Sequence, residues 1–151
     1  MRYFQILLSL AAAASAVDVR FHSNNGCSGT TIQCGNLGPD SCCGLDNAAF
    51  KSMGFDAIPL DWSIETRSYN LGRCSHLRLL LPPQHTAHVC HDSGDDIARY
   101  TGGGYGFRNR KVDACGDGQE CKTSQKPDTL ILEEGQKYAV TDMGDDLLNE
   151  L

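Results

Sequence analysis

The sequence predicts an all-β or β-dominated domain that is small, secreted and cross-linked by disulfide bonds. The chain has 151 residues, eight of them cysteines. Its N-terminus has the composition of a signal peptide. Short segments that alternate apolar and polar residues are separated by turns rich in Gly, Asn and Asp, which is the pattern of short antiparallel strands. Together these observations favour one disulfide-stapled domain.

The N-terminal segment predicts secretion. Arg2 supplies a positive charge, residues 6–14 are almost wholly apolar, and Ala-Ser-Ala at residues 14–16 is a small-x-small cleavage site. We expect residues 1–16 to be a signal peptide and residues 17–151 to form a single domain. The apolar run is shorter than the ~20 residues that a membrane-spanning helix needs, so we expect no membrane anchor.

The charge of the expected mature chain excludes some partners. Removal of residues 1–16 takes away one arginine, which leaves 12 basic and 19 acidic residues, a net charge of −7. Nucleic acids and anionic membranes both reward positive charge. We therefore expect neither to be the main partner.

The cysteines predict four disulfide bonds, each contributing about 2–4 kcal/mol to stability. Cys42 and Cys43 are adjacent, so we expect them to have different partners. Two arrangements remain open. Either the first four cysteines pair among themselves while Cys74–Cys90 and Cys115–Cys121 close local hairpins, or the early cysteines reach across to the later ones. The eight are Cys27, Cys34, Cys42, Cys43, Cys74, Cys90, Cys115 and Cys121.

The first half of the chain predicts two confident strand regions around a less regular stretch. Residues 17–22 alternate apolar and polar side chains, and residues 30–34 are β-branched, so the two predict a hairpin across the Asn-Gly turn. Residues 47–53 predict one helical turn that Gly54 ends. Residues 60–66 alternate cleanly and predict a strand in which Trp62 packs inward, the alternative being a ligand platform.

The second half continues the strand pattern. Residues 79–81 predict a buried strand, which two prolines close. The glycine-rich residues 102–106 predict a flexible turn or loop. The acidic tail predicts a frayed helix packed through Leu147 and Leu148. Further strands are predicted at residues 87–89, 97–100, 129–132 and 138–141, with a hairpin turn at 115–121 and no internal repeat.

Three histidines within seven residues form the sharpest polar cluster. His85, His88 and His91 are followed by aspartates, and these are the ligand types of zinc and copper sites. We expect no other cofactor. The alternative is a polar loop or edge strand with solvated histidines, because on a strand His88 would face away from the other two.

A second candidate site is a binding loop that joins aromatic and basic residues. Tyr105, Phe107, Arg108 and Arg110 follow the glycine-rich run, and exposed aromatics with arginine suit the recognition of protein or sugar. The alternative is a hairpin in which Phe107 packs inward. A hydrolytic site can also be assembled from Glu65, His76, Arg78 and His88, but no spacing selects it, and we predict no catalytic residues.

Two resemblances concern the N-terminal hairpin. Phe21, a Gly-containing turn and then Gly-Thr-Thr-Ile-Gln-Cys at residues 29–34 resemble the opening hairpin of a βγ-crystallin-type Greek key, which implies a β-sandwich. The pattern Phe-x-Ser-x-x-x-Cys-Ser-Gly at residues 21–29, with Cys34 and Cys42-Cys43, resembles small secreted cysteine-rich proteins of fungi.

The fungal resemblance implies an effector-like or toxin-like protein, with a role in virulence, that is secreted to the extracellular space. It would bind an extracellular or host protein or a cell-wall polysaccharide and would not be an enzyme. One alternative is a protease inhibitor or an antimicrobial, killer-toxin-like protein that presents residues 102–111 as a rigid loop. A secreted hydrolase or ribonuclease, or a metal-binding protein, is a weaker alternative.

Overall fold

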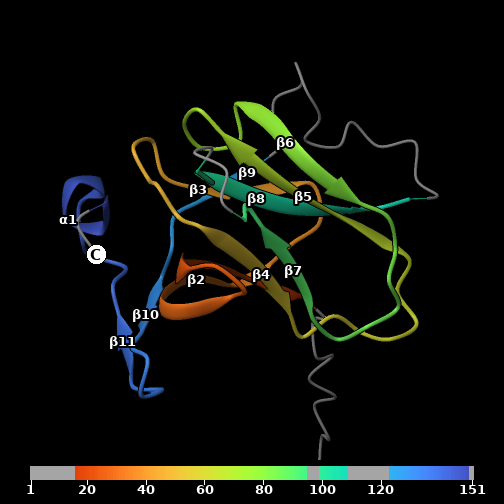
Figure 1. Ribbon diagram of the computed structural model, residues 1–151, viewed down its shortest axis with the longest axis horizontal. Helices are drawn as coiled ribbons and strands as arrows, with labels where there is room; N and C mark the ends of the chain where they lie inside the picture. Colours follow the sequence, from red (N-terminus) through yellow and green to blue (C-terminus); the bar gives the residue numbers. More distant parts are fainter. Residues whose placement is uncertain (1–15, 95–98, 109–122, 150–151) are drawn as a thin grey trace, which may run out of the picture.

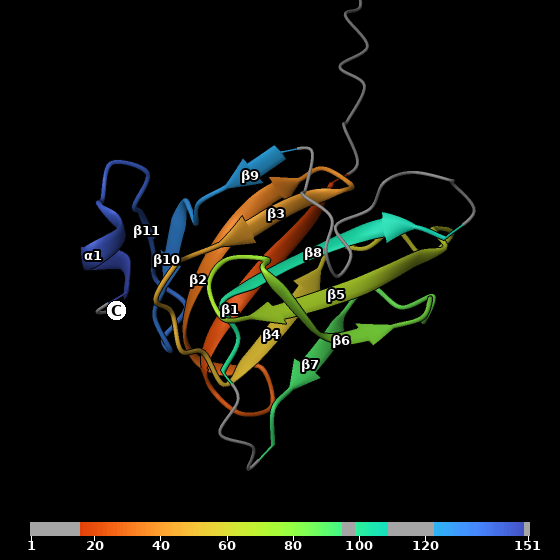
Figure 2. The same ribbon diagram turned by 90° about the horizontal axis from the view of Figure 1, so that it is seen from above.

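Two β-sheets packed face to face make up the fold (Figures 1 and 2), which confirms the β-dominated prediction. The computed structural model describes residues 16–94, 99–108 and 123–149, so residues 1–15 of the expected signal peptide lie outside the described residues. Sheet A has the order β11 (Lys137–Ala139), β10 (Thr129–Ile131), β2 (Ser28–Leu37), β1 (Val17–Asn24), β4 (Ser52–Asp56) and β7 (Val89–Asp92). Sheet B has the order β6 (His76–Leu81), β5 (Ile64–Asn70), β8 (Gly102–Phe107), β3 (Ser41–Gly44) and β9 (Thr123–Gln125).

The first four strands and the next four follow the same path. Strands β1, β2 and β4 lie together in sheet A, while β5, β6 and β8 lie together in sheet B. The third strand of each set crosses over, so that β3 joins sheet B and β7 joins sheet A. In each set the fourth strand returns beside the first, as in a Greek key. The sequence suggested no internal repeat; the repeat lies in the topology.

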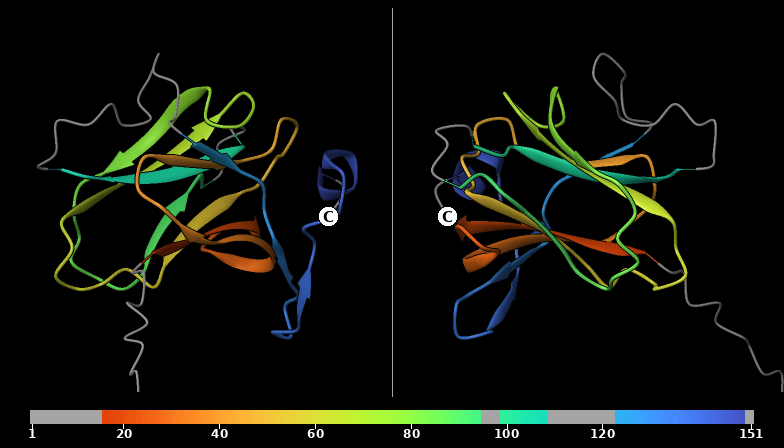
Figure 3. Two further views of the ribbon diagram at one scale, coloured as in Figure 1. Left: turned by 180° about the vertical axis from the view of Figure 1, so that it is seen from behind. Right: turned by 45° about the vertical axis from the view of Figure 1, so that its right-hand side comes forward.

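The core lies between the inner faces of the two sheets. Alternation along β1 and β4 turns Val19, Phe21, Met53 and Phe55 inward, and all four are fully buried. The C-terminal segment, blue in Figure 3, lies at one end of the sandwich and ends in helix α1 (Asp145–Asn149). Leu148 of this helix is fully buried, whereas Leu147 is exposed.

Two disulfide bonds occupy equivalent places in the repeated path. Cys27 in the β1–β2 turn is bonded to Cys90 on β7, and Cys74 in the β5–β6 turn is bonded to Cys42 on β3. Each bond therefore fastens the first turn of one four-strand set to the third strand of the other set. The predicted pairing of Cys74 with Cys90 is wrong, because they lie on different sheets.

The third disulfide bond joins the two sheets through the core. Cys34 of β2 is bonded to Cys43 of β3, and both are fully buried. Cys42 and Cys43 have different partners, as expected from their adjacency. Of the two predicted arrangements, the early cysteines thus reach across to later ones in two bonds and pair locally in one. Cys115 and Cys121 lie outside the described residues.

The glycine-rich run is a strand at the centre of sheet B, which corrects the prediction of a flexible loop. Strand β8 pairs with both β5 and β3, and none of its glycines has a positive φ. Glycine is required there by packing. A Cβ on Gly103 would lie 2.3 Å from Met53 Cε, and one on Gly104 would lie 2.5 Å from the Ser41 carbonyl oxygen.

Three other predicted elements differ from the structure. Residues 52–56 form strand β4 instead of ending a helical turn, because β4 has β1 and β7 on either side and its ladder bonds outweigh local preference. The strand predicted at residues 60–66 begins only at Ile64, and Leu60 is exposed in a turn. The strand containing residues 79–81 lies at the sheet edge and is half-buried, since it has a neighbour on one side alone.

The close packing of β8 generates the first prediction. Gly104→Ala should lower the free energy of unfolding by about 1–3 kcal/mol, because the added methyl group must displace the backbone of β3. Gly144→Ala is the matched control, since nothing lies within 4 Å of its Cβ position. Denaturant unfolding with intact disulfides measures both. A Gly104→Ala protein as stable as the Gly144→Ala protein would contradict this placement of β8.

Candidate functional site

Polar residues lie together on the outer face of sheet A, around Gly54, which has no side chain. Strand register aligns Arg20 of β1, Gly54 of β4 and Cys90 of β7 in one row across the sheet. His22 lies two residues further along β1, on the same face. Asp56 of β4 and His88, which precedes β7, flank the row on its other side. The name Gly54 cluster is used below for Arg20, His22, Gly54, Asp56 and His88.

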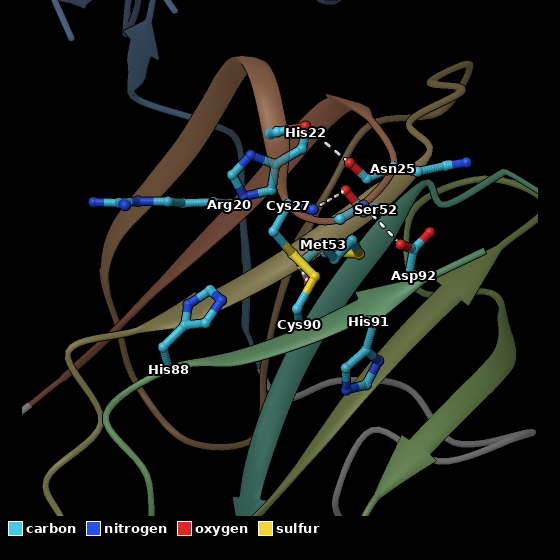
Figure 4. The surroundings of a disulfide bond; sticks show 12 residues. Arg20, His22, Asn25, Cys27, Ser52, Met53, His88, Cys90, His91 and Asp92 are labelled. Atoms are coloured by element: carbon cyan, nitrogen blue, oxygen red, sulfur yellow. Dashed lines mark hydrogen bonds between the residues drawn. A yellow bond between two sulfur atoms is a disulfide. The ribbon is translucent and has the colours of Figure 1, made fainter. Parts of the chain in front are cut away.

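The β1–β2 turn folds over this face and shields part of it (Figure 4). The backbone N–H of Cys27 donates to Ser52 Oγ at 2.9 Å, and that of Gly26 donates to Asp92 Oδ2 at 2.6 Å. The bond between Cys27 and Cys90 fixes the turn covalently. Beneath it His22 is only 7% exposed, although it points away from the core.

The hydrogen bonds around Thr31 favour one tautomer of His22. Thr31 Oγ1 lies 2.8 Å from His22 Nδ1 and donates its own proton to the Gly29 carbonyl at 3.1 Å. The hydroxyl therefore accepts from Nδ1–H, which leaves Nε2 with a lone pair. Burial lowers the pKa of His22 to about 4, even though Asp56 acts to raise it. The ring is neutral at neutral pH.

Two acceptor atoms face the gap above Gly54 and accept no hydrogen bond from the described residues. A Cβ on Gly54 would lie 2.9 Å from His22 Nε2 and 3.3 Å from Asp56 Oδ2, with His88 Cε1 at 3.5 Å. Both acceptor atoms are buried and have no hydrogen-bond partner in the described part of the chain. Buried polar atoms normally find a partner, so an unpaired pair at one gap points to a ligand or a water molecule.

Asp56 is the electrostatic centre of the cluster. Its Oδ1 lies 2.5 Å from His88 Nδ1, and its Oδ2 lies 3.4 Å from an Arg20 guanidinium nitrogen. Arg20 also donates from Nε to Gln33 Oε1 at 2.7 Å. Half of the His88 side chain is exposed, compared with about a fifth of the Asp56 side chain.

Sheet B provides an internal comparison for the gap. Arg67 pairs in register with Gly104 there, as Arg20 pairs with Gly54 in sheet A. The Cβ position of Gly104 is already filled by the carbonyl oxygen of Ser41, whereas that of Gly54 faces polar side-chain atoms. Of these two equivalent glycines, Gly104 therefore allows close packing in sheet B, whereas Gly54 leaves a gap lined by hydrogen-bond acceptors in sheet A.

The comparison extends to His22. Its counterpart, two residues after the arginine of sheet B, is Tyr69, which is fully buried against Cys42, Cys74 and Leu77. A residue beneath the first turn can thus be held by aromatic packing. The fold therefore does not require a histidine beneath the β1–β2 turn, nor a ring nitrogen there that lacks a hydrogen bond.

The structure does not bring the three predicted histidine ligands together. His91 is fully buried between the sheets, with Thr66 Oγ1 2.8 Å from Nε2 and Ser68 Oγ 2.8 Å from Nδ1. His88 projects from the opposite face of the strand (Figure 4). His85 is exposed in the preceding loop. A site shared by all three is wrong, because both nitrogens of His91 are engaged inside the sandwich.

The predicted aromatic binding loop is also not a surface. Tyr105 is 1% exposed and donates from its hydroxyl to the Leu37 carbonyl at 2.8 Å. Phe107 packs against Trp62 with ring centroids 4.8 Å apart, so both aromatics belong to the core and the inward alternatives hold. Arg108 is exposed, and Arg110 lies outside the described residues.

The other polar groupings do not converge. Glu65, His76 and Arg78 lie on sheet B, whereas His88 lies beside sheet A. In the described part of the chain, one set of three metal-binding groups has donor atoms within 4.8 Å of one another, namely Cys27, His88 and Cys90. The sulfurs of Cys27 and Cys90 are bonded to each other, so neither cysteine offers a thiolate to a metal ion.

The sequence predicted His88 but missed His22, Gly54 and Asp56. A signal existed for His22, because alternation from Val17 places it on the outer face with Arg20. No signal existed for Gly54 and Asp56, since their strand was not recognised. The pairing of β4 between β1 and β7 is what assembles the cluster.

The buried His91 generates a pH prediction. Burial lowers its pKa to about 4, so the unfolded chain binds an extra proton between pH 4 and 6.5. The contribution is fully present above pH 6.5 and should fall by about 3 kcal/mol as the pH drops to 4. Unfolding of wild type and His91→Gln across this range measures it, because the difference between them cancels other titrating groups. Parallel curves for the two proteins would contradict the burial of a neutral His91.

No helix in the described residues is long and apolar enough to span a membrane. No curated protein and no solved structure matched the chain. Residues 18–128 match the ARB_05566_N family, which is described as an N-terminal domain. The matched segment contains both four-strand sets, apart from Val17, and the three disulfide bonds found among the described residues. The chain therefore belongs to the ARB_05566_N family.

Proposed function

We propose that this protein is secreted and acts by binding an extracellular or host target, as an effector-like or toxin-like protein without enzymatic activity. The observation that carries the proposal is the pair of equivalent disulfide bonds, Cys27–Cys90 and Cys42–Cys74. They fasten each turn to a strand from the other half, and so hold the surface of the sandwich in one arrangement. A pre-organised surface loses less entropy on binding.

Disulfide bonding supports secretion. All six cysteines in the described residues are paired, and such bonds persist in oxidising compartments, whereas cytosolic thiols are kept reduced. The predicted signal peptide at residues 1–16 points the same way. Cross-linking also protects a protein where proteases destroy transiently unfolded chains.

The alternatives have less support. The protease-inhibitor and killer-toxin alternatives relied on an exposed loop at residues 102–111, and residues 102–107 of it form the central strand β8. The hydrolase alternative relied on residues that the structure places on two different sheets. A cell-wall polysaccharide or an extracellular protein remains the proposed target class.

A secretion and capture experiment tests this function. Expression of the full chain in a eukaryotic host should release protein into the medium that begins at Val17 and has no free thiols. This oxidised protein, immobilised, should retain a saturable ligand from a preparation of cell-wall polysaccharide or of extracellular protein. Reduced and alkylated protein should retain none, because the surface is lost with the cross-links.

Turnover assays on RNA and polysaccharides complete the test, and the expected rate is that of buffer alone. Turnover that survives purification and is abolished by His88→Gln would contradict a pure binding role. Retention of the protein inside the cell, with reduced cysteines, would contradict secretion.

A further inference from the structure

We propose that the gap above Gly54 binds one divalent transition-metal ion, zinc or copper, through His22 Nε2 and Asp56 Oδ2, with His88 completing the protein ligands. This goes beyond the proposed function and stands independently of it. The first step is the imbalance of hydrogen bonding. Two buried acceptors face the gap, and neither has a hydrogen bond from the described residues; Asp56 Oδ2 has only the 3.4 Å ion pair with Arg20. Such a gap complements a cation.

The second step is the kind of donor. An imbalance of acceptors alone would also suit calcium or magnesium, but those ions take oxygen ligands. Here one acceptor is the Nε2 of His22, whose other ring nitrogen is hydrogen-bonded to Thr31 Oγ1, and the other is a carboxylate oxygen of Asp56. This nitrogen and oxygen set is what zinc and copper prefer.

The third step is the support behind His22. Its Nδ1–H donates to Thr31 Oγ1, and that hydroxyl donates to the Gly29 carbonyl. A histidine that binds metal through one nitrogen usually donates from the other to a fixed oxygen, which sets the tautomer and orients the ring. The relay from His22 through Thr31 to Gly29 is of this form.

The fourth step concerns His88 and the neighbouring charge. His88 donates from Nδ1–H to Asp56 Oδ1, and must exchange this contact for the ion. Its ring is half exposed at the edge of the gap, so rotation is not blocked by packing. Arg20 lies 3.4 Å from Asp56 Oδ2 and opposes a cation there. Removal of this charge should therefore tighten binding.

The experiment uses the purified, oxidised protein and titrates Zn²⁺ and Cu²⁺ by isothermal calorimetry. Wild type should bind one ion per chain. His22→Phe and Asp56→Asn should each weaken binding at least about tenfold, and Thr31→Val about tenfold, as is typical of ligand and supporting residues. Arg20→Gln should bind several-fold more tightly. His85→Gln is the control and should bind as wild type does.

A steric variant tests the gap without removing any donor. Gly54→Ala places a methyl group 2.9 Å from His22 Nε2 and 3.3 Å from Asp56 Oδ2, and should abolish binding. Gly38→Ala is its matched control, because the nearest atom to that Cβ position is 3.8 Å away. Thermal unfolding and a thiol assay verify that each variant is folded and fully oxidised. Nitrogen hyperfine coupling in the Cu²⁺ resonance spectrum should decrease in His22→Phe.

Three results would overturn the proposal. Wild type could bind no ion at one equivalent. Binding could persist in Gly54→Ala and His22→Phe but disappear in His85→Gln, which would indicate surface histidines. A metal-soaked crystal could show a water molecule alone between Nε2 and Oδ2. Because secretion and target capture need no metal, these outcomes leave the proposed function unaffected.

Discussion

The exchange of third strands between the two halves is the constraint on which the rest of the structure depends. Because β3 and β7 each complete the opposite sheet, neither four-strand set has a finished sheet of its own. The exchanged strands are short, with four residues each, so their backbone hydrogen bonds alone attach them weakly to the opposite sheet. The Cys42–Cys74 and Cys27–Cys90 bonds strengthen this attachment, and the Cys34–Cys43 bond joins the inner faces of the two sheets.

The same constraint creates the positions beneath the two turns. Each turn must fold over its sheet to reach the exchanged strand, and so covers an outward-facing residue of the first strand. In sheet B that residue is Tyr69, which packs with the disulfide. In sheet A it is His22, whose unpaired nitrogen faces the gap above Gly54. The same architecture thus supports a packed tyrosine beneath the turn of sheet B and a polar cluster beneath the turn of sheet A.

The sequence could predict what local pattern determines. Strands β1, β2, β10 and β11 follow alternation and β-branching, and all lie near their predicted positions. It failed where neighbours from distant parts of the chain decide. The sequence of strand β8 predicts a loop, because its glycines are required by close contacts with Met53 and Ser41, which are far away in sequence. The site was hidden for the same reason, since Gly54 and Asp56 acquire meaning only when β4 lies between β1 and β7.

The spacing of the disulfide bonds has a consequence for biosynthesis. Cys34 and Cys43 have a sequence separation of nine and can pair as soon as both have been synthesised. Cys27 must wait for Cys90, 63 residues later, and Cys42 must wait for Cys74. In the interval Cys27 and Cys42 are free thiols beside a young Cys34–Cys43 bond, which they can attack by exchange. The native pairing is therefore complete only after β7 has been synthesised and docks, and any exchange at Cys34–Cys43 before then must be reversed.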